Sequence, residues 1–227
     1  MKSAKNYFNV INKPLLVGDD STKVVSVVNF PELHVLTGIL GKLVKEMEHI
    51  LESSESGVSV LSDWMESVNV AKTVYHGSCS FVGDMAKRFL KNLDSLSSTV
   101  ESYLDCETRD KILPFIRALA KLNIVREMCF GQTLKDGYKE AVEDFSITYR
   151  GLNISFPLKV HLVEAHLVEY LELKGGVKGA GFWSEQAMES CHRDFNKEWE
   201  NNKTLETDPM YGQKLLTSVV RYNGKHI

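Results

Sequence analysis

Apolar residues recur at steps of mostly three and four along most of the chain after residue 30. The clearest run predicts a helix over residues 31–51, and its apolar positions are Leu33, Leu36, Ile39, Leu40, Leu43, Val44, Met47, Ile50 and Leu51. This spacing places them on one face of a helix, the face that a globular protein buries. Pro31 suits the first turn of such a helix, and the polar stretch "ESSESG" (52–57) ends it.

Further stretches with the same periodicity predict more helices, over residues 58–68, 85–104, 109–130, 134–152, 157–173, 184–199 and 209–223. Pro114 is expected to start or kink its helix, because proline lacks the amide proton and clashes with the preceding turn. Lys174, Gly175 and Gly176 are typical of a helix end, and Ser184 is a suitable N-cap. The predicted fold class is therefore mainly α, a multi-helix single globular domain with about eight helices.

The first thirty residues differ from the rest of the chain. "KPLLVGDDSTKVVSVVNF" (13–30) combines β-branched runs with a turn-like "GDDS". Such a composition predicts extended chain or one or two short strands. The predicted organisation is an extended segment over residues 1–30 and a helical domain over residues 31–227.

Composition is that of an ordinary globular protein, with 43% hydrophobic and 25% charged residues. The formal charge of −3 provides no general positive field, so binding of nucleic acid requires a local basic patch. "KRFLK" (87–91) is the densest basic cluster and is typical of a solvated helix face. Four cysteines without a CxxC pair, and the lack of a signal peptide or a long apolar span, predict an intracellular protein, nuclear or cytoplasmic, without a membrane partner.

Polar residues at helical spacing define one candidate site. Glu185, Glu189, His192 and Asn196 share a face of the predicted helix over residues 184–199, beside an apolar stripe. Two carboxylates one turn apart repel each other unless a cation, a proton or a basic side chain lies between them. This row is therefore either a metal site, with Glu185, Glu189 and His192 as ligands, or a solvated helix face.

His161 and His166 lie in an otherwise apolar run. On an α-helix, five residues correspond to about 500° of rotation, which leaves the two imidazoles about 140° apart. A chelating pair on one α-helix needs a spacing of four. The two histidines are therefore candidate site residues that the spacing does not favour as a pair; the alternative is that each is a core histidine with a hydrogen-bond partner.

The pattern ExxH occurs twice, at Glu46–His49 and at Glu189–His192. Two such pairs contribute to the carboxylate di-metal centre of ferritin-like bundles. The alternative is chance, because a glutamate-rich chain with seven histidines is expected to contain about one ExxH.

Several segments together resemble proteins encoded by mobile elements of invertebrate genomes, which are similar to the C-terminal half of DDE transposases with an RNase H fold and a helical insertion. These segments are "NVINKPLL", "FPELHVLTGILGKLVKEM", "VYHGSCSFVGDMAKRFLKNLDSL", "PLKVHLVEAHLVEYLE", "GFWSEQAMESCHRDF" and "DPMYGQKLLTSVVRYNGKHI". Their order along nearly the whole chain carries the resemblance.

The resemblance implies a metal-dependent DNA strand transferase or nuclease. "PELH" (31–34) resembles the segment after the second acidic residue of related transposases, which makes Glu32 and His34 further candidates. Residues 58–152 would be the helical insertion and residues 157–227 the C-terminal helices. Glu185 or Glu189 would be the last acid and bind one of two Mg²⁺ or Mn²⁺ ions, which activate water and stabilise the leaving oxygen.

An RNase H core also needs several strands and a first aspartate on the central one. At most one or two strands are predicted before residue 31, and Asp19 and Asp20 lie in the turn-like stretch. The leading hypothesis is therefore a truncated or domesticated transposase fragment without independent catalysis that binds DNA or a protein partner. The alternatives are a helical protein-interaction module unrelated to transposition and a ferritin-like carboxylate metal protein.

Overall fold

The structure is a computed structural model of the 227-residue chain, and it describes residues 29–54, 57–75, 78–183 and 194–226. Contacts within the chain divide it into two compact units, Met1–Trp183 (unit 1) and Ser184–Ile227 (unit 2), and each is described here by itself. The division introduces a boundary inside the helical domain predicted for residues 31–227. The strands predicted for residues 1–30 fall almost entirely outside the described residues.

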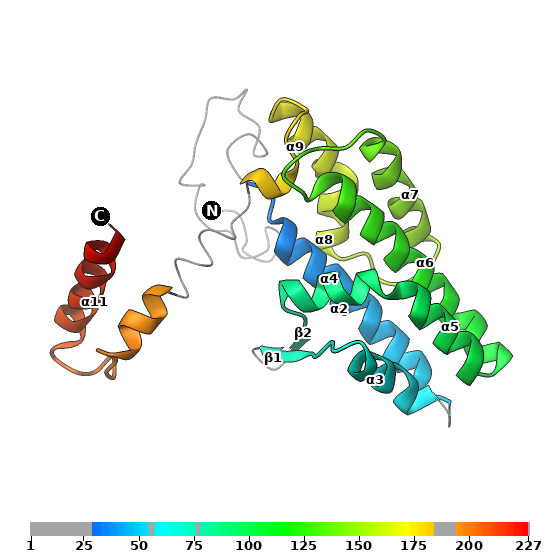
Figure 1. Cartoon of the computed structure of the whole chain (residues 1–227), viewed down its shortest axis with the longest axis horizontal. Coiled ribbons are helices and arrows are strands. Elements are labelled where there is room, and N and C mark those ends of the chain that lie inside the picture. Colours follow the sequence, from blue (N-terminus) through cyan, green and yellow to red (C-terminus); the bar gives the residue numbers. More distant parts are fainter. Residues whose placement is uncertain (1–28, 55–56, 76–77, 184–193, 227) are drawn as a thin grey trace, which may run out of the picture. The chain divides into compact units, whose positions relative to one another are not determined.

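Unit 1 is a helical bundle, which confirms the predicted mainly α class (Figure 1). Its long helices are α2 (Glu32–Leu51), α3 (Gly57–Ser67), α4 (Gly83–Lys91), α5 (Leu93–Tyr103), α6 (Cys106–Cys129) and α7 (Tyr138–Arg150). They are followed by α8 (Leu158–His161), the π-helix η2 (Leu162–Leu167), α9 (Val168–Leu173) and the 3₁₀ turn η3 (Ala180–Trp183). A short antiparallel hairpin joins β1 (Thr73–Tyr75) to β2 (Ser78–Ser80), with Val74 opposite Cys79.

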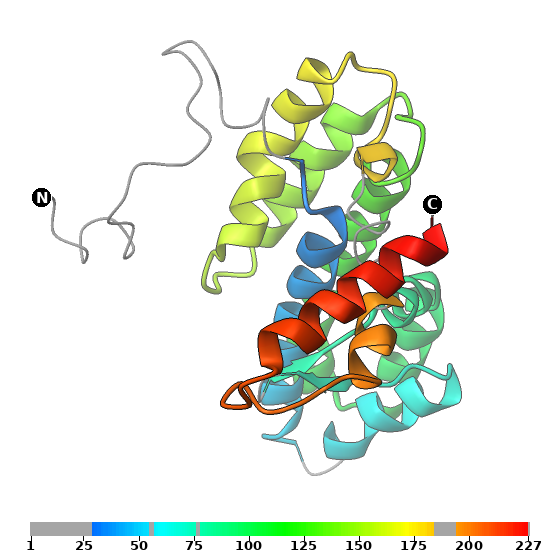
Figure 2. The same cartoon turned by 90° about the vertical axis from the view of Figure 1, so that its left-hand side faces the viewer.

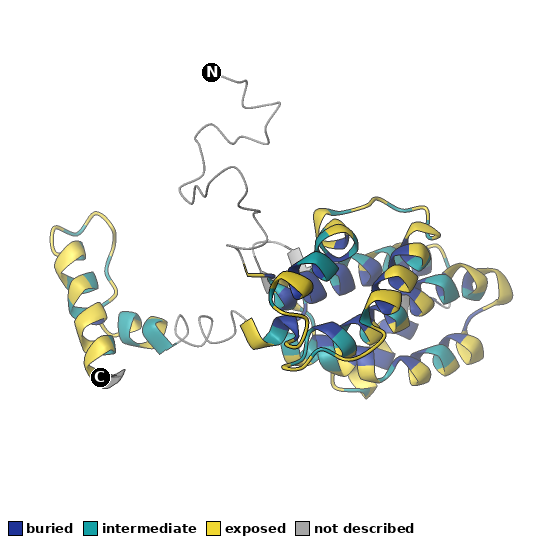
Figure 3. Ribbon diagram, turned by 90° about the horizontal axis from the view of Figure 1, so that it is seen from above, coloured by how far each residue is buried: buried dark blue, intermediate teal, exposed yellow. Residues whose placement is uncertain are grey.

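Helix α2 lies at the centre of this bundle and packs against α3, α4, α6 and α8. Its apolar face is the one that the spacing predicts, since Ile39, Leu40, Leu43 and Met47 have no exposed surface. Burying each of these side chains stabilises the fold by roughly 1.5–3 kcal/mol before conformational entropy is subtracted. Figure 3 shows the buried faces of the helices turned toward one another and the exposed faces turned outward.

Three predicted helices differ in detail. The helix predicted over residues 85–104 is two helices, α4 and α5, which meet at Asn92, where the backbone leaves the helical region (φ −107°, ψ 19°). Helix α6 begins at Cys106, where the Asp105 carboxylate accepts a hydrogen bond of 2.9 Å from the Thr108 amide. It therefore does not start at Pro114, which lies inside it. The helix predicted over residues 157–173 begins after Pro157 as expected but contains the π-helix η2.

Unit 2 consists, in its described part, of a helical stretch over residues 194–200 and helix α11 (Tyr211–His226). Two aromatic contacts join them: Phe195 with Tyr222, and Trp199 with Tyr211. The Asp208 carboxylate precedes α11 and accepts hydrogen bonds from the Thr204 hydroxyl, the Met210 amide and the Lys214 ammonium group. These three hydrogen bonds lower the pKa of Asp208 to about 2, and the bond from Thr204 has the largest effect.

Among the residues that the structure describes, none of the helices has both the length and the apolar character needed to span a bilayer.

Candidate functional site

The predicted acidic row on residues 184–199 lies largely outside the described residues. This holds for all three of its predicted ligands, Glu185, Glu189 and His192. The metal-binding and catalytic roles predicted for them stay predictions. Across the described ranges, no group of three or more His, Cys, Asp or Glu side chains is placed to hold a metal ion.

Glu32 and His34 lie in the first turn of α2, at the end of the bundle where α6 and α9 also end. Glu32 is 4% exposed, while His34 is exposed to solvent. The ring of Phe30 packs between Phe130 and Tyr170, with 5.9 Å between ring centres on both sides. Burial raises the pKa of Tyr170, and the charge of the nearby Glu32 carboxylate raises it further. Glu32 is thus buried at this end of the bundle, near Tyr170 of α9.

The possible ferritin-like metal centre consists of two ExxH pairs, and the structure describes one of them, Glu46 and His49. These two side chains do not face a common core. The Glu46 carboxylate accepts a hydrogen bond from the Lys42 ammonium group. The side chain of His49 is 84% exposed, and its Nδ1 lies 3.5 Å from Glu52. The Glu46 carboxylate is therefore paired with Lys42, and the His49 imidazole lies on the surface beside Glu52.

His161 and His166 form a ring pair, contrary to the separation predicted from α-helical geometry. Their ring centres are 5.0 Å apart and the ring planes are nearly perpendicular, at 88°. The reason is the π-helix η2, which begins directly after His161 and includes His166. Hydrogen bonds from i to i+5 place residues five apart about one turn apart. The two imidazoles therefore share one face.

The two imidazoles have different surroundings. His161 is exposed, whereas Nδ1 of His166 is buried and makes no hydrogen bond within the described part of the chain. A buried polar atom without a partner costs roughly 1–3 kcal/mol. One imidazole of the pair, that of His161, is therefore accessible to solvent. The other, that of His166, has a buried nitrogen without a hydrogen-bond partner in the described residues.

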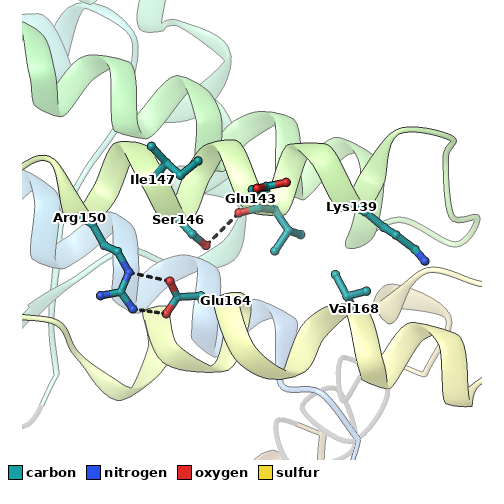
Figure 4. A pocket seen from close by; sticks show the side chains of 8 residues that line it. Lys139, Glu143, Ser146, Ile147, Arg150, Glu164 and Val168 are labelled. Carbon is teal, nitrogen blue, oxygen red and sulfur yellow. Dashed lines mark hydrogen bonds and ion pairs between the residues drawn. The ribbon is translucent and has the colours of Figure 1, made fainter.

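An open groove of about 340 Å³ runs between α7 and the η2–α9 segment (Figure 4). The Arg150 guanidinium group donates two hydrogen bonds, of 2.7 and 2.6 Å, to the Glu164 carboxylate across it. These bonds lower the pKa of Glu164 and raise that of Arg150. Lys139 at the groove is hydrogen-bonded to Glu172 on α9. Because these charged side chains bind each other across the contact between the helices, the groove is part of the packing of α7 against the η2–α9 segment.

The connection after α9 has a backbone conformation that favours glycine. Gly175 and Gly176 have positive φ angles of 93° and 66°, and the Gly176 amide donates to the Leu171 carbonyl. This ends the helix at the predicted position. The chain then runs antiparallel to the segment after α6, where Thr133 pairs with Lys178.

Two further glycines allow this connection to lie in close contact with the end of α6. A Cβ atom on Gly179 would lie 2.3 Å from the Gly131 carbonyl oxygen, and one on Gly181 would lie 2.3 Å from the Phe130 carbonyl oxygen. The Gln132 side chain donates a 3.1 Å hydrogen bond to the Gly181 carbonyl. Figure 2 shows η3 beside the loop that follows α6. The connection is thus fixed to the bundle on both sides of Ala180.

This connection carries a cluster of lysine and aromatic side chains, Lys174, Lys178, Phe182 and Trp183, which we call the basic–aromatic corner. The Nζ atom of Lys174 lies 5.2 Å from the ring centre of Trp183, and that of Lys178 lies 4.6 Å from the ring centre of Phe182. The two aromatic rings are 4.9 Å apart at 78°. Phe182 is 44% exposed and Trp183 36%. Large aromatic side chains with so much exposed surface, each below a cation, are typical of a binding surface.

The corner is locally positive although the whole chain is acidic. No aspartate or glutamate occurs between Lys174 and Trp183. The nearest acidic residue before it, Glu172, is bonded to Lys139. The two lysines of the corner are therefore not compensated by acids within residues 174–183.

Sequence reasoning did not identify the corner. Its signal was present in "LKGGVKGAGFW" (173–183), which combines lysines and aromatic residues without an acid. The pattern alone does not tell whether Phe182 and Trp183 are buried. The glycine contacts that turn the segment along the surface depend on residues 130–132, which are distant in sequence.

The chain matches no family model, no curated protein and no solved structure.

Proposed function

We propose that this chain binds single-stranded nucleic acid, DNA in the first instance, at the basic–aromatic corner. The observation that carries the proposal is the pair of exposed rings of Phe182 and Trp183, each below a lysine ammonium group. Proteins that bind single strands combine aromatic rings, on which bases stack, with cations that bind the backbone phosphates.

The two kinds of side chain serve different parts of the ligand. Every base has a π face, so stacking on Phe182 and Trp183 tolerates any sequence. The ammonium groups of Lys174 and Lys178 provide the electrostatic attraction for phosphates. A rigid support favours binding because little conformational entropy is lost, and the glycine contacts with residues 130–132 provide it.

The resemblance to mobile-element transposases favours DNA over RNA. A truncated transposase fragment that keeps a DNA contact but does not cut DNA agrees with this proposal. Base stacking on exposed rings requires unpaired bases, which favours single-stranded over duplex DNA.

The proposal is tested by fluorescence anisotropy with a labelled oligothymidine of about 12 nucleotides, within the usual site size of such proteins. We expect saturable binding that weakens as salt rises. A duplex of the same length should bind more weakly. Absence of binding at low salt, or equal affinity for the duplex, would contradict the proposal.

A second candidate function is self-association through α11, the interaction-module alternative. Leu216 and Val220 are each 61% exposed, and Val219 is 37% exposed, while Ser218 on the same helix is buried. An apolar face of this kind is self-complementary in a two-fold dimer. The molar mass from light scattering should then fall on dilution in wild-type protein and remain that of a monomer in Leu216→Glu. A monomer at all concentrations excludes this candidate.

A further inference from the structure

We propose that His161 and His166 form a binding site for a transition-metal ion of the Zn²⁺, Ni²⁺ or Cu²⁺ type. The proposal rests on the π-helix, which brings two imidazoles five residues apart onto one face. Single π-helical turns inside α-helices occur frequently at functional sites. The site is independent of the basic–aromatic corner and of its proposed ligand.

The separation of the rings fits a shared ion. A Zn–N bond of about 2.0–2.1 Å places the centre of a coordinated imidazole roughly 3 Å from the metal. Two imidazoles on a tetrahedral ion then have ring centres roughly 5 Å apart. The observed distance is 5.0 Å. The helix backbone thus already holds the two side chains at the spacing that chelation needs.

The orientation of the rings requires only a side-chain movement. In the structure they meet edge to face at 88°. Rotation about χ2 of histidine crosses a broad, shallow well, so both rings can turn a nitrogen toward a common point while the helix stays in place. Exposure of His161 gives a metal ion access to the pair. Coordination would also use the imidazole of His166, whose Nδ1 makes no hydrogen bond in the described part.

The ligand set defines which metals bind. Neutral imidazole suits Zn²⁺, Cu²⁺ and Ni²⁺, whereas Mg²⁺ prefers oxygen ligands. Two protein ligands leave the other positions of the ion to water, so the site is weaker than the four-ligand structural zinc sites. The two histidines should bind Ni²⁺ more weakly than Cu²⁺, and they should not bind Mg²⁺. This preference separates the histidine pair from the Mg²⁺ or Mn²⁺ site predicted at Glu185 and Glu189.

The test is calorimetric titration of the full chain with Zn²⁺, combined with proton NMR of the seven histidine rings during addition of Ni²⁺. We expect one saturable site, and two ring signals broadened before the other five. His161→Ala should lower the affinity at least tenfold, because loss of an outer-shell partner of a metal ligand alone costs about 10- to 100-fold. His161 is exposed, so this variant should fold normally, which circular dichroism checks.

His49→Ala is the matched control, since His49 is an exposed histidine on another helix of unit 1 and should leave the titration unchanged. His166→Ala should reproduce the loss seen with His161→Ala. Binding that survives His161→Ala, binding that is lost instead in His192→Ala, or no saturable binding of Zn²⁺ would each overturn the proposal.

Discussion

Replacement of Trp183 by alanine should weaken single-stranded DNA binding without changing its salt dependence. Trp183 is 36% exposed, and its ring centre lies 4.9 Å from that of Phe182, so in the proposed complex it would provide part of the stacking surface. Stacking of one base on an aromatic side chain contributes about 1–3 kcal/mol. Loss of one such contact corresponds to an affinity about 5- to 150-fold lower.

The salt dependence follows from the lysines. Each phosphate neutralised on a single strand contributes about −0.7 to the slope of log K against log salt, so two lysines give about −1.4. Between 50 and 200 mM salt the affinity should then fall about sevenfold. Trp183→Ala keeps both ammonium groups and should keep this slope. Lys174→Ala with Lys178→Ala should bring it close to zero.

Fluorescence anisotropy of a labelled oligothymidine at four or more salt concentrations measures both quantities. Tyr103→Ala is the matched control, because Tyr103 is an aromatic residue on α5 that is 69% exposed and lies outside the corner. An affinity of Trp183→Ala equal to that of Tyr103→Ala would refute the assignment of stacking to Trp183. An unchanged slope in the double lysine variant would refute the assignment of phosphate contacts.

Three further predictions concern stability and support of the corner. Leu43→Ala should lower the free energy of unfolding, measured by urea denaturation, by about 2–5 kcal/mol, because Leu43 is fully buried. The control Ile147→Ala changes a residue that is 63% exposed and should alter this free energy by under about 0.5 kcal/mol. Gly179→Ala should reduce both stability and oligothymidine binding, since its Cβ would lie within 2.8 Å of two backbone oxygens. Gly38→Ala should leave binding unchanged, because the atoms nearest to its Cβ belong to the movable Lys159 side chain. The pKa of Asp208, about 2, lies below the ordinary value of 3.8, so its carboxylate stabilises the start of α11 above pH 4 and this contribution is lost as pH falls toward 2. The Met210 amide signal in NMR should report that loss in wild type, and a pH titration of Asp208→Asn should lack it.

The apolar pattern predicted the helices well because burial decides them. The face of α2 follows directly from the spacing of Ile39, Leu40 and Leu43, all fully buried. The break between α4 and α5 was not predicted, because Asn92 is tolerated in a helix and the apolar spacing continues across it. The β1–β2 hairpin is not among the predicted elements, since strands of three residues are too short for a pattern of alternation to be recognised.

The ring pair of His161 and His166 shows where the sequence argument fails at the candidate sites. The predicted angle of about 140° assumed an α-helix throughout. A π-helix changes the residues per turn, and nothing in "VHLVEAHLVE" marks the change from α8 to η2. The basic–aromatic corner was missed for another reason. Its exposure depends on glycine contacts with residues 130–132, and periodicity contains no information about such distant neighbours.

The most direct test of the central claim is the fluorescence of Trp183 during titration with oligothymidine. Trp64 is buried in unit 1, so Trp199→Phe leaves Trp183 as the exposed indole of the described residues. If bases stack on Trp183, its emission should be quenched to a plateau, with the same midpoint as the anisotropy change and recovery at high salt. Emission that stays constant while the oligonucleotide binds would show that the strand contacts another surface, and would contradict the proposed function of the basic–aromatic corner.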